Sequence, residues 1–322
     1  MFYGWIEGMG FFGKTKKLNG LLAFGFASDG VCTSRITRVS GAKPVVEHAS
    51  FAPVKPALTP DALEKIAREA HAAQYHCATL LGGRDYQMLA VESPNVQPDE
   101  LKAAVRWRLK DMLDFHVDDA TIDVLDIPPD PNASGRANSM FAVAARNSVV
   151  EARMSLFSDA KVAMEVIDIP EMAQRNISAM LEPEGRGLAM LSFAEDGGLL
   201  TVTFRAELYL SRRIEVTLEQ VMESDPDRRN QYFDKITLEL QRSLDHFDRQ
   251  FHFVTVSRLV LAPLASSALH DYLSSNLYMP VDMLDLNSVL DLAKVPDLQA
   301  PAQQQRHFLT LGAALRFEET VL

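Results

Sequence analysis

The stretch LLAFGFASDG, residues 21–30, comes closest in this chain to a phosphate-binding loop. A short apolar run ends in small residues and is followed by Asp29 and Gly30. Strands that deliver a loop to a phosphate often have this form, because small residues let backbone amides approach the oxygens. Asp before Gly is equally typical of a plain turn. The stretch therefore indicates a nucleotide site, the remains of one, or a hairpin between strands.

No other catalytic or metal-binding motif is found. The chain lacks G-x-x-x-x-G-K-[ST], G-x-G-x-x-G and G-x-S-x-G, and its eight histidines form no H-E-x-x-H and no Cys/His ligand set. Asp123 and Asp126 lie on one expected strand with opposite parity, so they cannot share a face. Arg212 and Arg213 also alternate on a strand, and we expect one to be solvated and one to be paired. The sequence thus predicts no metal site.

Bulk composition narrows the function classes further. The net charge of −11 argues against a nucleic-acid partner. Only two cysteines, Cys32 and Cys77, occur in 322 residues, which suits a reducing compartment. No apolar run approaches the ~20 residues that span a bilayer, so we expect no transmembrane segment.

The elements that must position any site alternate between strands and helices. Residues 21–26, 30–39 and 43–51 read as three strands, and Thr59 and Pro60 are typical of a helix start. After residues 182–187 the pattern restarts with three strands and a long helix, roughly 228–251. The core stripe of that helix has helical spacing, Phe233, Ile236, Leu240, Leu244, Phe247 and Phe251. The repeated order predicts two α/β domains with mixed sheets.

The predicted domain boundaries follow from this pattern. Residues 1–20 form an N-terminal tail, 21–184 a first domain and 185–322 a second domain. The first domain contains an inserted subdomain over about 97–140. The second includes a C-terminal helix over about 306–317 that could pack back on the first.

Six stretches, in this order, resemble a known family, the PilM-like actin-fold proteins of type IV pilus assembly. They cover most of residues 97–316, and the resemblance is weakest in the first 95 residues. Within the family they are most similar to members that serve MSHA-type pili, and the cytoplasmic domain of the type II secretion protein GspL is similar in fold and role. The stretches are LKAAVRWRLKDMLDFHVDDATIDVLDI, FAVAARNSVVEARMSLF, VIDIPEMAQRNISAM, LYLSRRIEV, LELQRSLDHFDRQF and LGAALRF.

The resemblance implies an actin-like, ribonuclease-H-like ATPase fold, whose two domains each have a mixed sheet and helices and face a central cleft. ATP-binding members begin with a strand ending in Asp, an apolar residue, Gly and Ser, followed by a Lys. Here Gly25 stands at the Asp, Ala27 at the Gly and Cys32 at the Lys, and only Ser28 is retained. The first loop is therefore predicted to be the relic of a phosphate loop.

The loops of the second domain depart from the family pattern in the same way. Their positions are Ser192 and Ala194 for the repeated Asp and Gly, with Asp196 and Gly197 in the turn that follows, Thr217 and Leu218 for the paired glycines, and Ala262 and Pro263 for the adenosine-side glycines. Mg-ATP needs acidic ligands and a backbone without Cβ atoms near the phosphates. We therefore expect no cofactor and no enzymatic activity. An ATPase that binds Mg-ATP through atypical loops is the alternative, and a sugar or metabolite kinase is a weaker one.

The family's role implies a cytoplasmic adaptor at the inner-membrane face. It would hold the N-terminal tail of a PilN-like bitopic membrane protein in a groove of the first domain and contact motor or platform proteins, with a homodimer as a further candidate assembly. The helix predicted over 97–115 leaves Arg106, Trp107 and Lys110 off its apolar stripe, which makes them candidate partner-binding residues. A partly buried core position is the alternative interpretation of Trp107.

Overall fold

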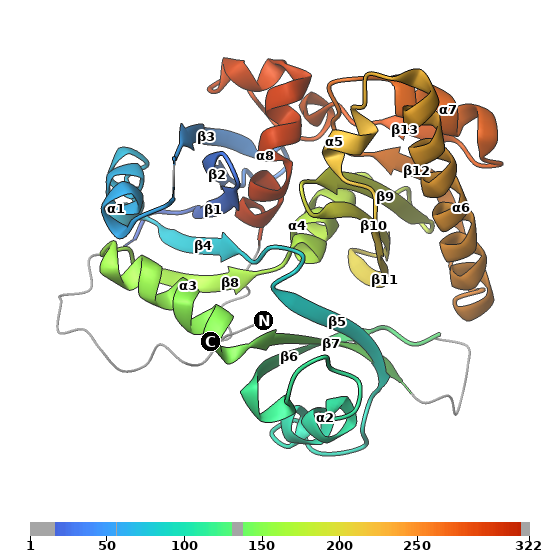
Figure 1. Cartoon of the computed structure of the whole chain (residues 1–322), viewed down its shortest axis with the longest axis horizontal. Coiled ribbons are helices and arrows are strands. Elements are labelled where there is room, and N and C mark those ends of the chain that lie inside the picture. The colour runs from blue at the N-terminus through green and yellow to red at the C-terminus, as the bar shows by residue number, and fades with distance from the viewer. Residues whose placement is uncertain (1–16, 56, 131–137, 317–322) are drawn as a thin grey trace.

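The computed structural model describes residues 17–55, 57–130 and 138–316, and its strands form three sheets (Figure 1). Two sheets have five strands and the third has three. The N-terminal tail predicted over residues 1–20 lies outside the described residues, except for residues 17–20. In the described part of the chain, no helix is long and apolar enough to cross a membrane.

The first sheet has the order β3-β2-β1-β4-β8. β1 to β3 are antiparallel neighbours, whereas β4 and β8 add in parallel. As the sequence predicts, α1 begins at Pro60, with Thr59 as its N-cap. The helices α1 and α3 pack with one face of the sheet in a shared apolar cluster, in which the rings of Phe24 and Phe157 meet edge to face. The bounds are β1 (Leu21–Ala27), β2 (Gly30–Thr37), β3 (Val45–Pro53), β4 (His76–Leu80), β8 (Met164–Asp168), α1 (Pro60–Glu69) and α3 (Asn147–Asp159).

The second sheet repeats the first in order and direction, as β11-β10-β9-β12-β13. Three antiparallel strands come first and two parallel strands follow. The long helix α6 and α7 lie on its outer side (Figure 1). The bounds are β9 (Gly187–Ala194), β10 (Gly197–Phe204), β11 (Glu207–Ile214), β12 (Val256–Leu261), β13 (Val281–Met283), α5 (Leu218–Val221), α6 (Pro226–Gln250) and α7 (Ala268–Asn276).

The third sheet, of order β5-β7-β6, is inserted into the first domain and carries α2. Its strands span residues 86–146, a wider range than the inserted subdomain predicted over about 97–140. The helix predicted over 97–115 forms only between Leu101 and Leu109, because the chain turns there into a loop that brings Leu113 and Phe115 onto the core of this sheet. The bounds are β5 (Tyr86–Glu92), β6 (Ala120–Ile127), β7 (Ser139–Arg146) and α2 (Leu101–Leu109).

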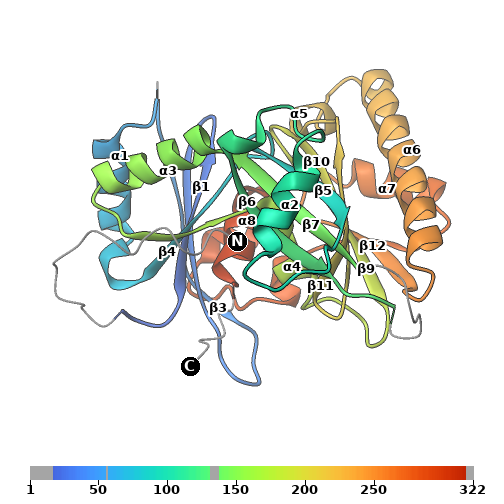
Figure 2. The same cartoon turned by 90° about the horizontal axis from the view of Figure 1, so that it is seen from below.

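Two central helices, α4 (Pro170–Ser178) and α8 (Pro301–Ala314), join the larger domains. α8 comes from the end of the chain and contacts β1, β2 and β4 of the first sheet, while α4 contacts β9, β10 and β11 of the second. The two helices also pack on each other between the sheets (Figures 1 and 2). This helix pair is therefore the main contact between the two larger domains.

The apolar stripe of α6 packs on the second sheet as its spacing predicts, with one exception. Phe233, Ile236, Leu240 and Phe247 are fully buried. Leu244 is only partly buried, and Ser243 takes the buried position beside it. The contact face of a helix follows its 3.6-residue period, so Leu244 falls at the border of that face.

His307 on α8 is buried against the first sheet, where its Nδ1 lies 3.2 Å from the hydroxyl of Ser34. Burial, and secondarily the charge of Arg306, lowers the pKa of His307 to about 4. The unfolded chain therefore takes up a proton at this residue from about pH 6.5 downward, whereas the folded chain does so only near pH 4. Stability from this group is present above pH 6.5 and is lost between the two values, at about 1.4 kcal/mol per pKa unit.

We expect His307→Gln to flatten the acid side of the stability profile. The difference between pH 6.5 and pH 4 should shrink by roughly 3 kcal/mol relative to the natural chain, measured by urea titration at each pH. His246→Gln, at an exposed position of α6, is the matched control and should leave the profile unchanged. Identical profiles for the natural chain and His307→Gln would contradict the assignment.

Candidate functional site

A cleft of about 990 Å³ lies between the two larger domains, and the β1–β2 and β9–β10 hairpins enter it from opposite sides. The structure brings together almost all of the loop residues singled out from the sequence. Ala262, at the end of β12, is absent from the lining, and Ala265 lines the cleft instead. The lining includes Gly25, Ala27, Ser28, Ser192, Ala194, Asp196, Gly197 and Thr217.

At Gly25, where the family places its first aspartate, the structure leaves no room for a side chain. A Cβ atom on Gly25 would lie 2.5 Å from the Cγ2 atom of Thr310 on α8. The hydroxyl of Thr310 bonds in turn to Ser34 at 2.8 Å and to the carbonyl of His307 at 2.9 Å. A side chain at residue 25 would therefore require Thr310 to leave these hydrogen bonds or α8 to shift.

At Ser192, the corresponding position of the second domain, the side chain belongs to a buried polar network. Its hydroxyl donates to Oε1 of Gln174 at 2.5 Å. The amide nitrogen of Gln174 donates to the carbonyls of Met190 and Leu199 and to the hydroxyl of Thr201, at 2.8 to 3.2 Å. All polar atoms of Gln174 are thus used inside the fold, and Ser192 helps to anchor α4 to the second sheet.

The remaining family positions also serve local structure. Thr217 is the N-cap of α5 and forms a capping box with Gln220. Cys32, at the place of the family's lysine, is buried, and burial raises the pKa of its thiol to about 11. The site therefore has no cation at this position, and within the described ranges no group of three metal-ligating side chains converges.

Two arginines near the first hairpin already have carboxylate partners. Arg306 of α8 binds both oxygens of Asp29 at 2.9 and 3.1 Å and stacks on the ring of Phe51. Arg153 of α3 donates to Thr79 and to the carbonyl of Leu80, and its guanidinium lies 3.7 Å from Asp85. Their positive charge is therefore balanced within the fold.

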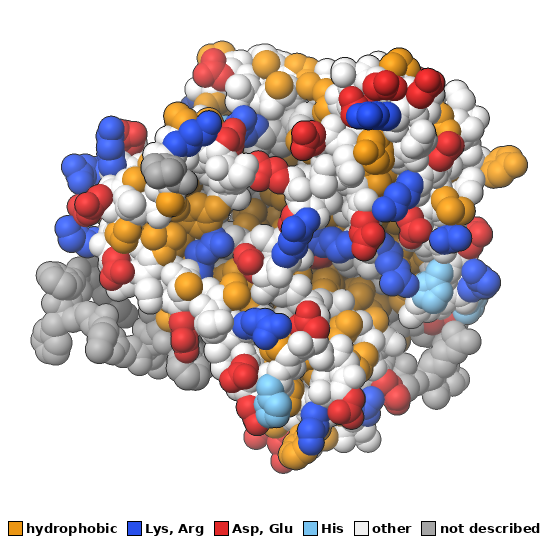
Figure 3. Space-filling view, viewed as in Figure 1, with side chains coloured by type: hydrophobic (Ala, Val, Ile, Leu, Met, Phe, Trp, Pro, Cys, Tyr) orange, Lys and Arg blue, Asp and Glu red, His pale blue; other side chains and the backbone are white. Residues whose placement is uncertain are grey.

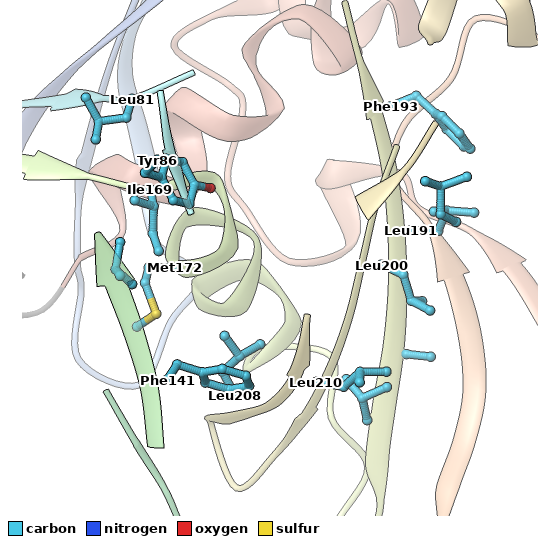
Figure 4. Packing of buried hydrophobic residues seen from close by; sticks show 14 of the residues in the cluster. Leu81, Tyr86, Phe141, Ile169, Met172, Leu191, Phe193, Leu200, Leu208 and Leu210 are labelled. Atoms are coloured by element: carbon cyan, nitrogen blue, oxygen red, sulfur yellow. The ribbon is translucent and has the colours of Figure 1, made fainter. Parts of the chain in front are cut away.

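A triad around the buried carboxylate of Glu171 joins the inserted sheet, α4 and the second sheet beside the cleft. The hydroxyl of Tyr86 on β5 donates to the carboxylate of Glu171 on α4, and Arg213 on β11 binds both groups, with its Nη2 at 2.9 Å from Oε1 of Glu171. The apolar core around it runs from Tyr86 and Phe141 through Met172 of α4 to the second sheet (Figure 4). Of Arg212 and Arg213, of which the sequence predicts that one is paired, Arg213 has the carboxylate partner. The sequence offered no signal for the Tyr86 and Glu171 partners.

Arg106, Trp107 and Lys110 lie on or just after α2, outside the lining of the cleft. Arg106 is tied to its own subdomain, since it donates to the carbonyls of Val117 and Ala120. Trp107 is 76% exposed, and the ammonium of Lys110 lies 6.0 Å from its ring centroid. The interpretation of Trp107 as a partly buried core residue is therefore wrong.

A second depression, an apolar groove of about 370 Å³, lies on the first domain. It runs between the β1–β2 hairpin, the chain before α1, and α3. Figure 3 shows hydrophobic side chains gathered in a hollow over the region between α1 and α3. The hairpin residues Phe26, Ala27 and Ser28 line both the groove and the cleft. The other groove residues are Gly30, Val31, Val54, Ala57, Leu58, Asp85, Val149, Ala152, Arg153 and Leu156.

Residues 47–194 match the family model of the type IV pilus assembly protein PilM. This match begins earlier than the stretches recognised in the sequence and ends before those of the second domain. No curated protein matches the chain significantly. Among solved structures, a chain of a PilM–PilN type IV pilus biogenesis complex matches with a TM-score of 0.75 at 18% identity, over 92% of this chain and 98% of that one.

Two further solved structures match less closely. A protein of unknown function from Bacteroides thetaiotaomicron, described as having an actin-like ATPase fold, gives a TM-score of 0.49 at 11% identity, over 91% of this chain and 99% of that one. The cytoplasmic domain of EpsL, an inner-membrane component of the Vibrio cholerae type II secretion system, gives 0.41 at 16% identity, over 64% and 76%.

The repeated sheet order, the helix pair between the sheets and the match over 98% of the chain from the PilM–PilN complex agree on the architecture. The fold class predicted from the sequence is confirmed. This chain has the two-domain actin-like ATPase fold, and residues 47–194 match the PilM family in sequence.

Proposed function

We propose that this chain is a PilM-like adaptor of a type IV pilus assembly platform, of the MSHA type, and that it lacks ATPase activity. It would act at the cytoplasmic face of the inner membrane, hold the N-terminal tail of a PilN-like membrane protein and contact the assembly motor or platform. The observation that carries the proposal is the match to the PilM–PilN complex over 98% of the matched chain, together with the PilM family match. The MSHA assignment rests on the resemblance of the six sequence stretches.

The side chains at the cleft support the proposal that this chain lacks ATPase activity. Phosphoryl transfer depends on positioning and on neutralising the charge of the phosphates. Here Thr310 fills the space beside Gly25, Ser192 is bonded to Gln174, and Cys32 is buried and neutral. At the two positions where the family pattern has an aspartate, this cleft has Gly25 and Ser192 instead.

We therefore expect no measurable binding of Mg-ATP. A ligand at a hundredfold excess over its Kd would stabilise the fold by about 2.7 kcal/mol, which thermal denaturation detects readily. The melting temperature should be the same with and without millimolar Mg-ATP. A clear upward shift that EDTA abolishes would favour the alternative function, an actin-like protein that binds ATP through atypical loops.

The apolar groove on the first domain is the surface that we propose for the tail. Its lining is largely aliphatic and offers pockets for the side chains of an extended peptide. The net charge of −11 favours encounter with a basic tail, an effect on association rate more than on affinity. The β1–β2 hairpin lines both the groove and the cleft. A tail bound in the groove would therefore contact a segment that also belongs to the domain interface.

Ala152→Glu should weaken binding of the tail peptide at least thirtyfold, about 2 kcal/mol, because it places a carboxylate in an apolar groove. Ala152 is exposed on α3, so the fold should tolerate the change. The measurement is calorimetry with synthetic N-terminal tails of PilN-like proteins. Ser158→Glu, exposed on the same helix and outside the groove lining, is the matched control.

Trp107→Ala tests the partner-binding residues predicted from the sequence in the same assay. The side chain is largely exposed, so its truncation should leave the fold intact. A loss similar to that of Ala152→Glu would extend the binding surface to α2. Unchanged affinity would confine the tail to the groove. If Ala152→Glu and Ser158→Glu bind the tail equally well, the groove is not the binding surface.

A further inference from the structure

We propose that the turn between β9 and β10 acts as a latch that holds the two domains together across the cleft without any nucleotide. The latch consists of the adjacent carboxylates of Glu195 and Asp196, which reach from the second domain to backbone groups of the first. This inference concerns the movement of the domains, and it does not depend on the identity of the partner.

Glu195 binds the tip of the first hairpin. Its two carboxylate oxygens accept hydrogen bonds from the backbone amide of Ser28 at 3.1 Å and from the Ser28 hydroxyl at 2.7 Å. One residue thus satisfies two donors of the opposing loop. Hydrogen bonds to an ionised acceptor are about twice as strong as neutral ones.

Asp196 binds a different segment of the first domain, the turn between β4 and β5. Its Oδ2 accepts a hydrogen bond from the backbone amide of Gly83 at 2.6 Å. A Cβ atom at residue 83 would lie 2.5 Å from the same oxygen and 2.4 Å from the guanidinium of Arg213. In this geometry Asp196 and Arg213 both pack directly against the backbone of Gly83, and a side chain there would displace them.

Glu195 and Asp196 bind N–H and O–H donors, which could equally bind an anionic ligand. A backbone amide and a hydroxyl that converge on one oxygen pair would bind a phosphate in the same manner. In this chain the anionic groups are the carboxylates of Glu195 and Asp196, on the β9–β10 turn of the other domain. The chain's own carboxylates thus take the place that a phosphate ligand would otherwise have in drawing the two hairpins together.

The latch adds to the attachments that the domains already have through α4 and α8 and through the Tyr86–Glu171–Arg213 triad. A contact at the hairpin tips, on the open side of the cleft, restrains rotation of the domains about those attachments. Loss of the latch should therefore widen the cleft while both domains keep their structure.

The test is a distance measurement between spin labels at Lys65 on α1 and Ser274 on α7, which are exposed positions on different domains. Cys32 and Cys77 are buried and stay unlabelled. The natural chain should give one narrow distance distribution. Glu195→Ala/Asp196→Ala should add a longer-distance population. Glu219→Ala removes a cleft carboxylate that has no hydrogen bond or ion pair to another described residue, and it should match the natural chain.

An unchanged distribution in the double variant would overturn the latch. Should that variant fail to fold, Glu195→Ala alone at its exposed site decides in the same way. Ser28→Ala and Glu195→Ala, combined, should shift the distribution no further than Glu195→Ala does, because they break the same contact. Additive shifts would overturn the pairing of Ser28 with Glu195.

Discussion

Arg213→Met should lower the free energy of unfolding by about 3–5 kcal/mol, because it strips a buried carboxylate of its charge partner. Glu171 is 1% exposed, and Arg213 is its ion-pair partner at 2.9 Å. Burial, and secondarily Glu171, raises the pKa of Tyr86 well above its usual value, so the Tyr86 hydroxyl remains a donor to that carboxylate. Methionine retains much of the side-chain volume but supplies no donor.

Urea titration at neutral pH measures this loss, and Arg212→Met is the matched control. Arg212 is the preceding residue on the same strand and is exposed, so its replacement should cost less than about 0.5 kcal/mol. Equal stability of the two variants would show that Glu171 does not depend on Arg213. Because the triad joins β5, α4 and β11, this loss arises where the inserted sheet, α4 and the second sheet meet.

Gly312→Val should destabilise the chain by more than about 3 kcal/mol, beyond the usual 1–3 kcal/mol of an overpacked core. A Cβ atom at residue 312 of α8 would lie 2.2 Å from the backbone carbonyl oxygen of Ala173 on α4. The carbonyl of Gly312 also accepts a hydrogen bond from Asn176 at 2.9 Å, which fixes the register of the two helices. A backbone atom cannot rotate away as a side chain can, so the helices must separate.

The direction of the change in stability is informative, because replacing glycine in an isolated helix would stabilise that helix. Replacing glycine within a helix normally gains a few tenths of a kcal/mol up to about 1 kcal/mol. Thermal denaturation distinguishes the two outcomes. Ala302→Val, exposed in the first turn of the same helix, is the control and should change stability by less than about 1 kcal/mol. A Gly312→Val variant as stable as this control would mean that α4 and α8 do not pack as closely as the structure has them.

Local patterns in the sequence predicted most of the elements. Thr59 and Pro60 mark the start of α1 because a side-chain cap and a fixed proline φ act within one turn. The stripe of α6 follows from a period that depends only on helix geometry, and Leu244 departs from it because the width of the contact face is set by the sheet beneath. The ends of α2 were predicted less well, since a loop that packs on the inserted sheet replaces the last turns of the predicted helix.

The sequence by itself determined the order of strands and helices, the repeat of that order in two halves, and the absence of acidic residues at the family's loop positions, because each of these is a property of local segments or of residue type. Only the tertiary structure decided that Thr310 fills the space at Gly25, that Arg213 rather than Arg212 is paired, and that Glu195 reaches Ser28. These contacts join residues 42 to 285 positions apart. They form only when the two sheets and the helix pair are packed together. Neither the periodicity of a segment nor the propensities of its residues determine that packing.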